Sequence, residues 1–283
     1  MAMLQPVCLA LPHIDLAGYF SGPRDGAPAI SLHGWLDNAG SFARLAPRLE
    51  GLRVLHLDLA GHGLSGHRAA GAGYPLWAYA EDTLQVAEHL GWQRFSLIGH
   101  SLGAIISVQL AAACPERVER LALIDGLLPP TEAPEHGPAR LGQALRERLA
   151  LANKRKPLYA HRERAIEARM RGRLAVSRGA SELLAERGLV SVEGGYTWRS
   201  DSRLMLASPV RLTLDQALAH AGALTCPALL MLAERGILRD HRAVLAGLPL
   251  QQVTLAGGHH LHIDDDVGAQ LVADCINRFF AFS

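Results

Sequence analysis

The amino-acid sequence predicts an α/β fold: a mostly parallel central sheet with helices on both faces. Short apolar runs alternate along the chain with segments of helical periodicity. The runs are nearly continuous in apolar residues, which is typical of parallel strands that are buried on both faces. One run ends in Gly-x-Ser-x-Gly, and a helical segment begins directly after it. In such a sheet the functional residues are expected where the strands end.

Six strands are expected in the core, and three of them are followed directly by a glycine. The first covers 29–33 and stops at Gly34, and the second covers 53–58 and stops before the tight turn Gly61-His62-Gly63. The other four cover residues 95–98, 121–125, 228–232 and 252–255. The turn after the second strand, from Asp58 to Gly66, is interpreted as structural, because it lacks the lysine and the glycine spacing of a phosphate loop.

Helices are expected between these strands, over residues 41–49, 77–90, 102–114, 241–248 and 267–280. The alternation stops at about 127–224, where Arg-rich helical sequence lies between the breaks Pro129-Pro130 and Cys226-Pro227. Helices are expected there over 140–149, 160–174 and 180–187. We therefore predict a core domain made of residues 1–126 and 225–283, with residues 127–224 inserted as a helical cap. The basic side chains over 140–173 are expected to form a solvated helix face.

Composition excludes several classes of function. The 28 Lys and Arg residues nearly balance the 27 Asp and Glu residues, so no basic field favours nucleic acid or an anionic membrane as partner. No apolar run is long enough to span a bilayer, and the N-terminus lacks the pattern of a secretory signal. The four cysteines are scattered and are interpreted as reduced thiols. We expect a cytoplasmic protein that acts on a small-molecule substrate, as a monomer or a dimer.

The segment Gly99-His100-Ser101-Leu102-Gly103 predicts a catalytic nucleophile. It lies between an apolar strand and a helix, which is the setting that the nucleophile-elbow motif requires. A serine on such a sharp turn is held in a strained backbone conformation, with its hydroxyl above the end of the sheet. Glycines two residues before and after it relieve the crowding that side chains would cause there. Ser101 is therefore the expected nucleophile.

The expected base is His259, in the loop Gly257-Gly258-His259-His260 after the last strand. A histidine late in the chain agrees with the chain order Ser…Asp…His of hydrolases with this motif. His260 is kept as the alternative base. A metal cluster of His259, His260 and His262 is disfavoured, because these residues lack the i, i+4 spacing of a helical site and have no cysteine ligands nearby. No metal and no cofactor are expected.

Two backbone N–H groups are the expected oxyanion hole. One belongs to Leu102, directly after the nucleophile, and the other to Trp35, in the loop after an early strand. Gly34 allows the close approach of that loop, and the Trp35 side chain is expected to line the acyl pocket. His33 is interpreted as a hydrogen-bonding support for the loop rather than as a base.

Taken together, these motifs resemble those of the α/β-hydrolase superfamily over nearly the whole chain. His33-Gly34-Trp35, the turn from Asp58 to Ser65, Gly99–Gly103 and Gly258-His259 stand in the order found in that superfamily. The segments 33–42 and 258–262 resemble the serine hydrolase-like branch. The resemblance implies an α/β-hydrolase fold, with a helical cap inserted after the sixth strand and with no cofactor.

The expected activity is that of a serine hydrolase, foremost a carboxylic ester hydrolase working through an acyl-enzyme on a small to medium ester. The fold also hosts amidases, lactonases and carbon–carbon hydrolases, and a non-catalytic ligand-binding homologue is a further alternative. A serine rather than an aspartate at the elbow disfavours epoxide hydrolase and dehalogenase chemistry.

The third triad member departs from the usual pattern. Many hydrolases of this kind carry Gly-x-x-Asp after the strand at 228–232, and here glycine, Gly236, stands where the aspartate is expected. Asp125 ends the preceding strand and can reach the histidine from the adjacent loop. Asp125 is therefore the expected acid, with Glu234 as the alternative and a cap on the following turn as the structural interpretation of Asp125.

Overall fold

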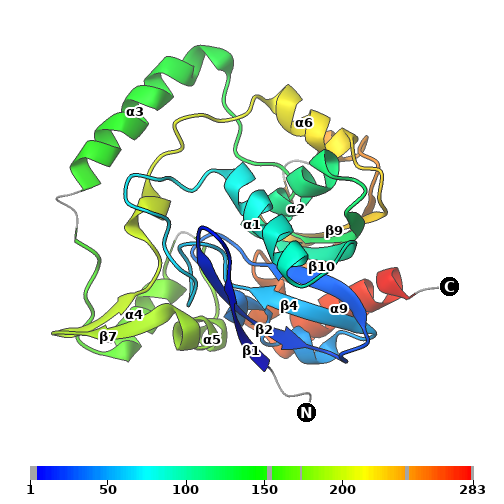
Figure 1. Ribbon diagram of the computed structural model, residues 1–283, viewed down its shortest axis with the longest axis horizontal. Coiled ribbons are helices and arrows are strands. Elements are labelled where there is room, and N and C mark those ends of the chain that lie inside the picture. The colour runs from blue at the N-terminus through cyan, green and yellow to red at the C-terminus, as the bar shows by residue number, and fades with distance from the viewer. Residues whose placement is uncertain (1–4, 152–154, 173, 240–241, 282–283) are drawn as a thin grey trace.

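A computed structural model describes residues 5–151, 155–172, 174–239 and 242–281 of the chain. Its larger sheet has eight strands within these residues, in the order β1-β2-β4-β3-β5-β6-β9-β10 (Figure 1). The strands are β1 (Gln5–Ala10), β2 (Asp15–Ser21), β3 (Ala27–Leu32), β4 (Leu52–Leu57), β5 (Phe95–His100), β6 (Val118–Ile124), β9 (Ala228–Arg235) and β10 (Gln251–Gly258). The pairs from β4 to β10 are parallel, whereas β1 pairs antiparallel with β2 and β2 pairs antiparallel with β4. The predicted mostly parallel sheet is confirmed.

Strands β1 and β2 were not predicted, because neither carries a continuous apolar run. Along β1 most residues are exposed and only Leu9 is buried, so no continuous apolar run marks this strand. In β2, Asp15 and Gly18 interrupt the apolar pattern. Edge strands with one face near solvent carry a weaker sequence signal than central strands do.

The sheet separates two apolar layers. Ile30 and Leu32 of β3 point into one layer, which holds side chains of the helices α1 (Leu76–His89) and α2 (Leu102–Ala113). Ala29 points into the other, which holds side chains of α9 (Asp266–Phe280). This alternation follows from the two-residue period of a strand. Helices therefore cover both faces of the sheet, as predicted (Figure 1).

Two predicted helices differ in detail. The helix expected over 41–49 is replaced by two 3₁₀ helices, η1 (Ala39–Phe42) and η2 (Ala46–Arg48). Pro47 explains the break, because proline has no N–H to donate and its ring clashes with the preceding turn of an α-helix. Of the helix expected over 241–248, the structure contains α7 (Arg242–Leu245), and residue 241 lies outside the described residues.

The chain between β6 and β9 contributes no described residue to the larger sheet. It contains η3 (Pro134–His136), α3 (Gly137–Ala150), α4 (Arg162–Met170), α5 (Arg178–Gly188), the hairpin strands β7 (Leu189–Val192) and β8 (Gly195–Trp198), η5 (Ser202–Met205) and α6 (Leu214–Gly222). In Figure 1 these elements lie above and to the left of the sheet, with α3 at the periphery. The hairpin and α6 were not expected from the sequence. That residues 127–224 form a separate cap domain stays a prediction.

Several polar contacts join this segment to the core. Asn38 donates from Nδ2 to the carbonyl oxygen of Leu184, over 2.8 Å. The backbone N–H of Ser177 donates to Asp264 Oδ1, and its hydroxyl donates to the Asp264 carbonyl oxygen, each over 2.7 Å. Within the described part of the chain, no helix has the length and apolar character needed to cross a membrane.

Candidate active site

Ser101 lies at the turn between β5 and α2, as the elbow motif predicts. Its backbone has φ 50° and ψ −111°, a region that residues other than glycine rarely adopt. Such strain costs about 1–3 kcal/mol and persists only where the surrounding structure holds it. Its N–H donates to the Ile124 carbonyl oxygen of β6 over 3.0 Å, and only 7% of the residue is exposed.

The glycines around Ser101 allow the backbone segments to approach closely. A Cβ on Gly99 would lie 2.5 Å from the backbone of Ala104, and a Cβ on Gly103 would lie 1.9 Å from the carbonyl oxygen of Leu32 in β3. A Cβ on Gly126 would lie 2.5 Å from the Ser101 carbonyl oxygen. No side chain fits at these distances without moving the backbone. The elbow therefore needs a glycine at Gly126 as well, a position that the motif did not point to.

His259 and Asp125 are hydrogen-bonded to each other. Nδ1 of His259 lies 2.7 Å from Oδ2 of Asp125, which lies directly after β6. Asp125 is fully buried, and its carboxylate also accepts from the N–H groups of Ala233, over 3.2 Å, and Ile237, over 2.9 Å. A carboxylate with these acceptor contacts holds the Nδ1–H tautomer of the ring, which leaves Nε2 as the acceptor nitrogen. Glu234, the alternative acid, is exposed near the end of β9.

Gly236 leaves room for the Asp125 carboxylate, which comes from the end of β6. A Cβ at this position would lie 2.2 Å from Oδ1 and 2.3 Å from Oδ2 of Asp125. The space that a side chain at 236 would occupy is therefore filled by the Asp125 carboxylate. The segment after β9 has no aspartate at this position, and a carboxylate from the end of the neighbouring strand β6 lies there instead.

Nε2 of His259 has no hydrogen bond partner among the described residues, and Ser101 Oγ is not bonded to it. Such bonds are often long before substrate binds and shorten in the complex. A direct contact nevertheless joins the elbow to the histidine loop. Nε2 of His100, the residue before Ser101, lies 3.0 Å from the carbonyl oxygen of His259, to which it donates.

The predicted oxyanion donors lie in the loop after β3 and at the start of α2. Among the described residues, neither the Trp35 N–H nor the Leu102 N–H donates a backbone hydrogen bond in a turn or loop. Leu36, next to Trp35, has a positive φ of 63°, so this loop also turns sharply. The Trp35 ring donates from Nε1 to the carbonyl oxygen of Leu204, over 3.1 Å, in the segment predicted as cap.

His33 and Asp58 have the contacts of structural residues. His33 Nε2 accepts from the N–H of Leu59 over 3.0 Å, and its Nδ1 lies 2.8 Å from the Gly34 carbonyl oxygen. Burial lowers the pKa of His33 from its usual value. Asp58 accepts from the N–H of Ala39 over 2.7 Å, within a turn that holds no phosphate-loop lysine.

A buried polar cluster lies beside the histidine loop, and the sequence did not reveal it. It contains Asp37, His100, His260 and Arg169, and the first three are at most 2% exposed. Arg169 Nη2 donates to Asp37 Oδ1 over 2.7 Å, and His260 Nε2 lies 3.3 Å from Asp37 Oδ2. Burial alone raises the pKa of the Asp37 carboxyl. The opposing effect of His260, Arg169 and His100 is larger, and it holds this pKa well below the usual range.

This cluster corrects the expectation of a wholly solvated basic face over 140–173. The Arg169 side chain is only 14% exposed because it turns inward to Asp37. The cluster also includes His100, for which the sequence indicated no role. Burial, followed by the neighbouring rings of His262, His259 and His260, lowers the pKa of His100 well below its usual range. The residues come from positions far apart in the chain, so no local spacing could have indicated them.

Comparisons with known proteins support the same fold. A sequence model of the alpha/beta hydrolase fold family matches residues 30–166. A serine hydrolase-like protein of Danio rerio is 31% identical over 273 residues, which cover 91% of this chain and 83% of the relative. A putative esterase/lipase of Haemophilus influenzae is 40% identical over 94 residues, covering 33% of this chain and 31% of the relative. The crystal structure of a hypothetical protein from Pseudomonas aeruginosa PAO1 is 59% identical, with a TM-score of 0.97, and the match covers 98% of this chain and all of the other.

Proposed function

The chain belongs to the α/β-hydrolase family, in the serine hydrolase-like branch, and from that premise we propose that it is a carboxylic ester hydrolase with the triad Ser101, His259 and Asp125. The observation that carries the proposal is the 2.7 Å hydrogen bond between His259 Nδ1 and Asp125, which leaves Nε2 unbonded next to the strained elbow. The name of the Haemophilus influenzae relative agrees with ester chemistry.

In the proposed reaction, Ser101 Oγ attacks the ester carbonyl carbon while His259 Nε2 takes the hydroxyl proton. The oxygen of the tetrahedral intermediate accepts hydrogen bonds from the N–H groups of Trp35 and Leu102, and each such donor contributes about 3–4 kcal/mol. His259 then passes the proton to the leaving alcohol, and an acyl-enzyme on Ser101 remains. Water activated by His259 hydrolyses the acyl-enzyme and restores the serine.

Asp125 keeps the ring of His259 in the reactive tautomer and stabilises the imidazolium that forms after proton transfer. The segment 127–224 acts as a cap over the carboxyl ends of the strands and determines which substrate shapes fit. Trp35 contributes to its closure, because its indole donates to Leu204 in that segment. The substrate is a small to medium ester, and no cofactor takes part in these steps.

Labelling with a fluorophosphonate probe, followed by a panel of short aryl esters, tests this function. We expect the wild-type chain to be labelled, and we expect Ser101→Ala and His259→Asn to lower ester turnover roughly 10⁴–10⁶-fold. Ser208→Ala is the matched control, because Ser208 is exposed and belongs to none of these contacts. Undiminished turnover in Ser101→Ala would refute the proposed nucleophile.

The same panel separates the alternatives. Amide, lactone and carbon–carbon substrates that turn over faster than every ester would move the activity to another bond on the same triad. A correctly folded chain that is neither labelled nor active would instead favour a non-catalytic ligand-binding protein.

A further inference from the structure

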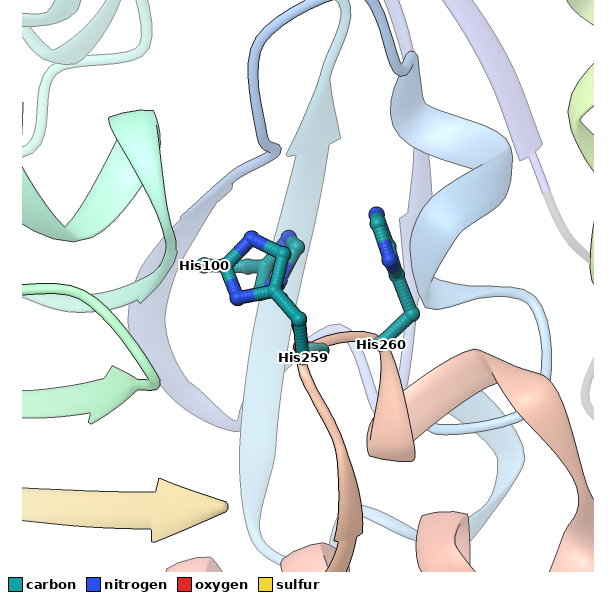
Figure 2. Close-up of side chains that lie close together, drawn as sticks. All are labelled: His100, His259 and His260. Carbon is teal, nitrogen blue, oxygen red and sulfur yellow. Dashed lines mark hydrogen bonds between the residues drawn. The ribbon is translucent and has the colours of Figure 1, made fainter. Parts of the chain in front are cut away.

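Three imidazole rings gather at the carboxyl ends of β5 and β10. One ring nitrogen from each of His100, His259 and His260 lies within 4.8 Å of the other two, and all three residues are buried (Figure 2). This set differs from residues 259, 260 and 262, which lie close to one another in the sequence and lack the spacing of a helical metal site. The third ring of the cluster comes instead from His100, which is 159 positions before His259.

Each ring has one nitrogen with a polar neighbour and one without a hydrogen bond. His259 Nδ1 is bonded to Asp125, His100 Nε2 donates to the His259 carbonyl oxygen, and His260 Nε2 faces Asp37 at 3.3 Å. The remaining nitrogens, His100 Nδ1, His259 Nε2 and His260 Nδ1, have no hydrogen bond partner among the described residues. Three ring nitrogens in one place therefore have no protein hydrogen bond and offer lone pairs to a ligand.

This pattern is the one found around histidines that bind a metal ion. Such a histidine usually donates its other ring N–H to a carboxylate or a backbone carbonyl, which fixes the tautomer and turns the free lone pair to the metal. Asp125 and the His259 carbonyl oxygen have that relation to two of the rings, and Asp37 Oδ2 lies 3.3 Å from Nε2 of the third. Two of the three outer contacts of a three-histidine site are therefore present as hydrogen bonds.

One oxygen of a carboxylate beside the rings has no hydrogen bond within the described part of the chain. Oδ2 of Asp37 has no hydrogen bond partner among the described residues and lies 3.8 Å from His100 Nδ1. Arg169 neutralises the other carboxylate oxygen, Oδ1, at 2.7 Å. Asp37 Oδ2 would therefore lie close to a divalent ion held by the neutral imidazoles.

We propose that His100, His259 and His260 bind a divalent transition-metal ion of the zinc class, and that the bound ion switches the hydrolase off. Imidazole ligands suit zinc, nickel and copper, whereas magnesium and calcium prefer oxygen. Nitrogen ligands of a tetrahedral zinc lie roughly 3.3 Å apart. The ring nitrogens lie within 4.8 Å of one another, so binding has to draw the rings together. Because this movement costs free energy, we expect micromolar affinity, which is weaker than that of a structural zinc site.

The inhibition rests on the proposed function, because the ion takes the lone pair of His259 Nε2, the atom that accepts the proton of Ser101. A metal-bound imidazole cannot act as a base. Metal binding itself does not depend on catalysis, so the two parts are measured separately.

Binding is measured by calorimetric titration of Zn²⁺ into the chelator-treated Ser101→Ala chain. We expect one ion per chain, an affinity at least tenfold weaker in Ser101→Ala/His260→Asn, and no binding of Mg²⁺. His89→Asn in the same background is the matched control, because His89 is exposed at the end of α1. X-ray absorption of the zinc-loaded wild-type chain counts its imidazole ligands without any variant. Absence of binding, fewer than three imidazole ligands, or an affinity unchanged in the His260→Asn background overturns the proposal.

Inhibition is measured as the rate at which a fluorophosphonate labels the wild-type chain. We expect saturating Zn²⁺ to slow labelling at least tenfold, chelator to restore it, and His260→Asn to abolish the effect of zinc. Zinc that binds without slowing the labelling overturns the assignment of His259 as a ligand. A chelator-treated chain that is never labelled refutes the proposed hydrolase while the binding measurement still tests the site.

Discussion

At the scale of single residues, positions 125 and 236 share one space. The carboxylate of Asp125 occupies the volume that any side chain at Gly236 would need, with only 2.2 Å between Oδ1 and a Cβ built there. Asp125 itself has a positive φ of 40°, a strained conformation that its three acceptor contacts hold in place. The Asp125 carboxylate and a side chain at 236 therefore cannot both occupy this space without a shift.

This geometry predicts that the acid can be moved from one strand to the other. Asp125→Asn keeps the shape but removes the charge that stabilises the imidazolium, and we expect ester turnover to fall roughly 10²–10⁴-fold. Gly236→Asp alone should also lower activity and stability, because it forces two carboxylates together. The double variant Asp125→Gly/Gly236→Asp should recover part of the activity lost in Asp125→Gly, measured as kcat/KM on a short aryl ester.

The control for this exchange is Asp125→Gly/Gly236→Asn, which restores the side-chain volume without the charge and should stay as inactive as Asp125→Gly. Equal activity of the Asp and Asn double variants would show that the charge at this place has no role in the reaction.

At the scale of elements, two buried ion pairs join helices of the predicted cap to loops of the core. Arg169 of α4 pairs with Asp37, and Arg187 of α5 pairs with Asp58, whose carboxylate is fully buried. Asp37 and Asp58 lie in the loops that follow β3 and β4, so α4 and α5 are held against the end of the sheet where Ser101 lies. The pairs therefore position this part of the segment relative to the candidate active site.

Removal of Arg187 should destabilise the protein, because it leaves Asp58 charged and buried without its cation. We expect Arg187→Met to lower the free energy of unfolding by about 3–5 kcal/mol, measured by urea denaturation at pH 7.5. Arg164→Met removes the exposed pair between Arg164 and Glu167 on α4 and should change it by less than about 1 kcal/mol. Similar losses in both variants would mean that burial of the Arg187 pair adds nothing.

At the scale of the whole molecule, buried neutral histidines make folding sensitive to acid. Burial lowers the pKa of His56, His62 and His262 from 6.5 to about 3 in each case. His56 bonds through both ring nitrogens, to Ser21 over 2.8 Å and to Ser31 over 2.7 Å. These rings are distributed through the core, so protonating any of them places a charge inside the packed protein.

Stability should therefore fall as the pH falls below about 6.5. Between pH 6.5 and about 3 the unfolded chain binds protons on these histidines and the folded chain does not, so acid favours unfolding. The contribution is complete above pH 6.5 and is lost progressively toward pH 3, with a slope approaching about 1.4 kcal/mol per pH unit for each histidine. Urea denaturation at pH 7.5, 6.0 and 5.0 measures the slope.

The His62→Gln variant should show a slope that is smaller by the contribution of one proton, because one buried titrating ring is removed. His89→Asn, at an exposed position, should leave the slope unchanged. A free energy of unfolding that is constant from pH 7.5 to 5.0 would contradict the assignment of these rings as neutral and buried.

Sequence reasoning was most successful where the signal is local. The strand-to-helix turn at Ser101 was predictable, because an apolar run, two glycines and a helical segment are adjacent in the chain. The central strands were predictable for the same reason, since strands buried on both faces are mostly apolar over adjacent residues. The edge strand β1 was not, because only Leu9 on it is buried.

The sequence by itself determined the fold class, the place of the elbow and the late histidine loop, because short-range pattern and backbone sterics decide them. Only the tertiary structure decided that Asp125 rather than Glu234 contacts His259, and that Gly236 leaves the room for it. It alone also brought His100 beside His260. The physical reason is that side-chain contacts at the end of a parallel sheet join residues from different strands, and their separation along the chain carries no trace of their distance in space.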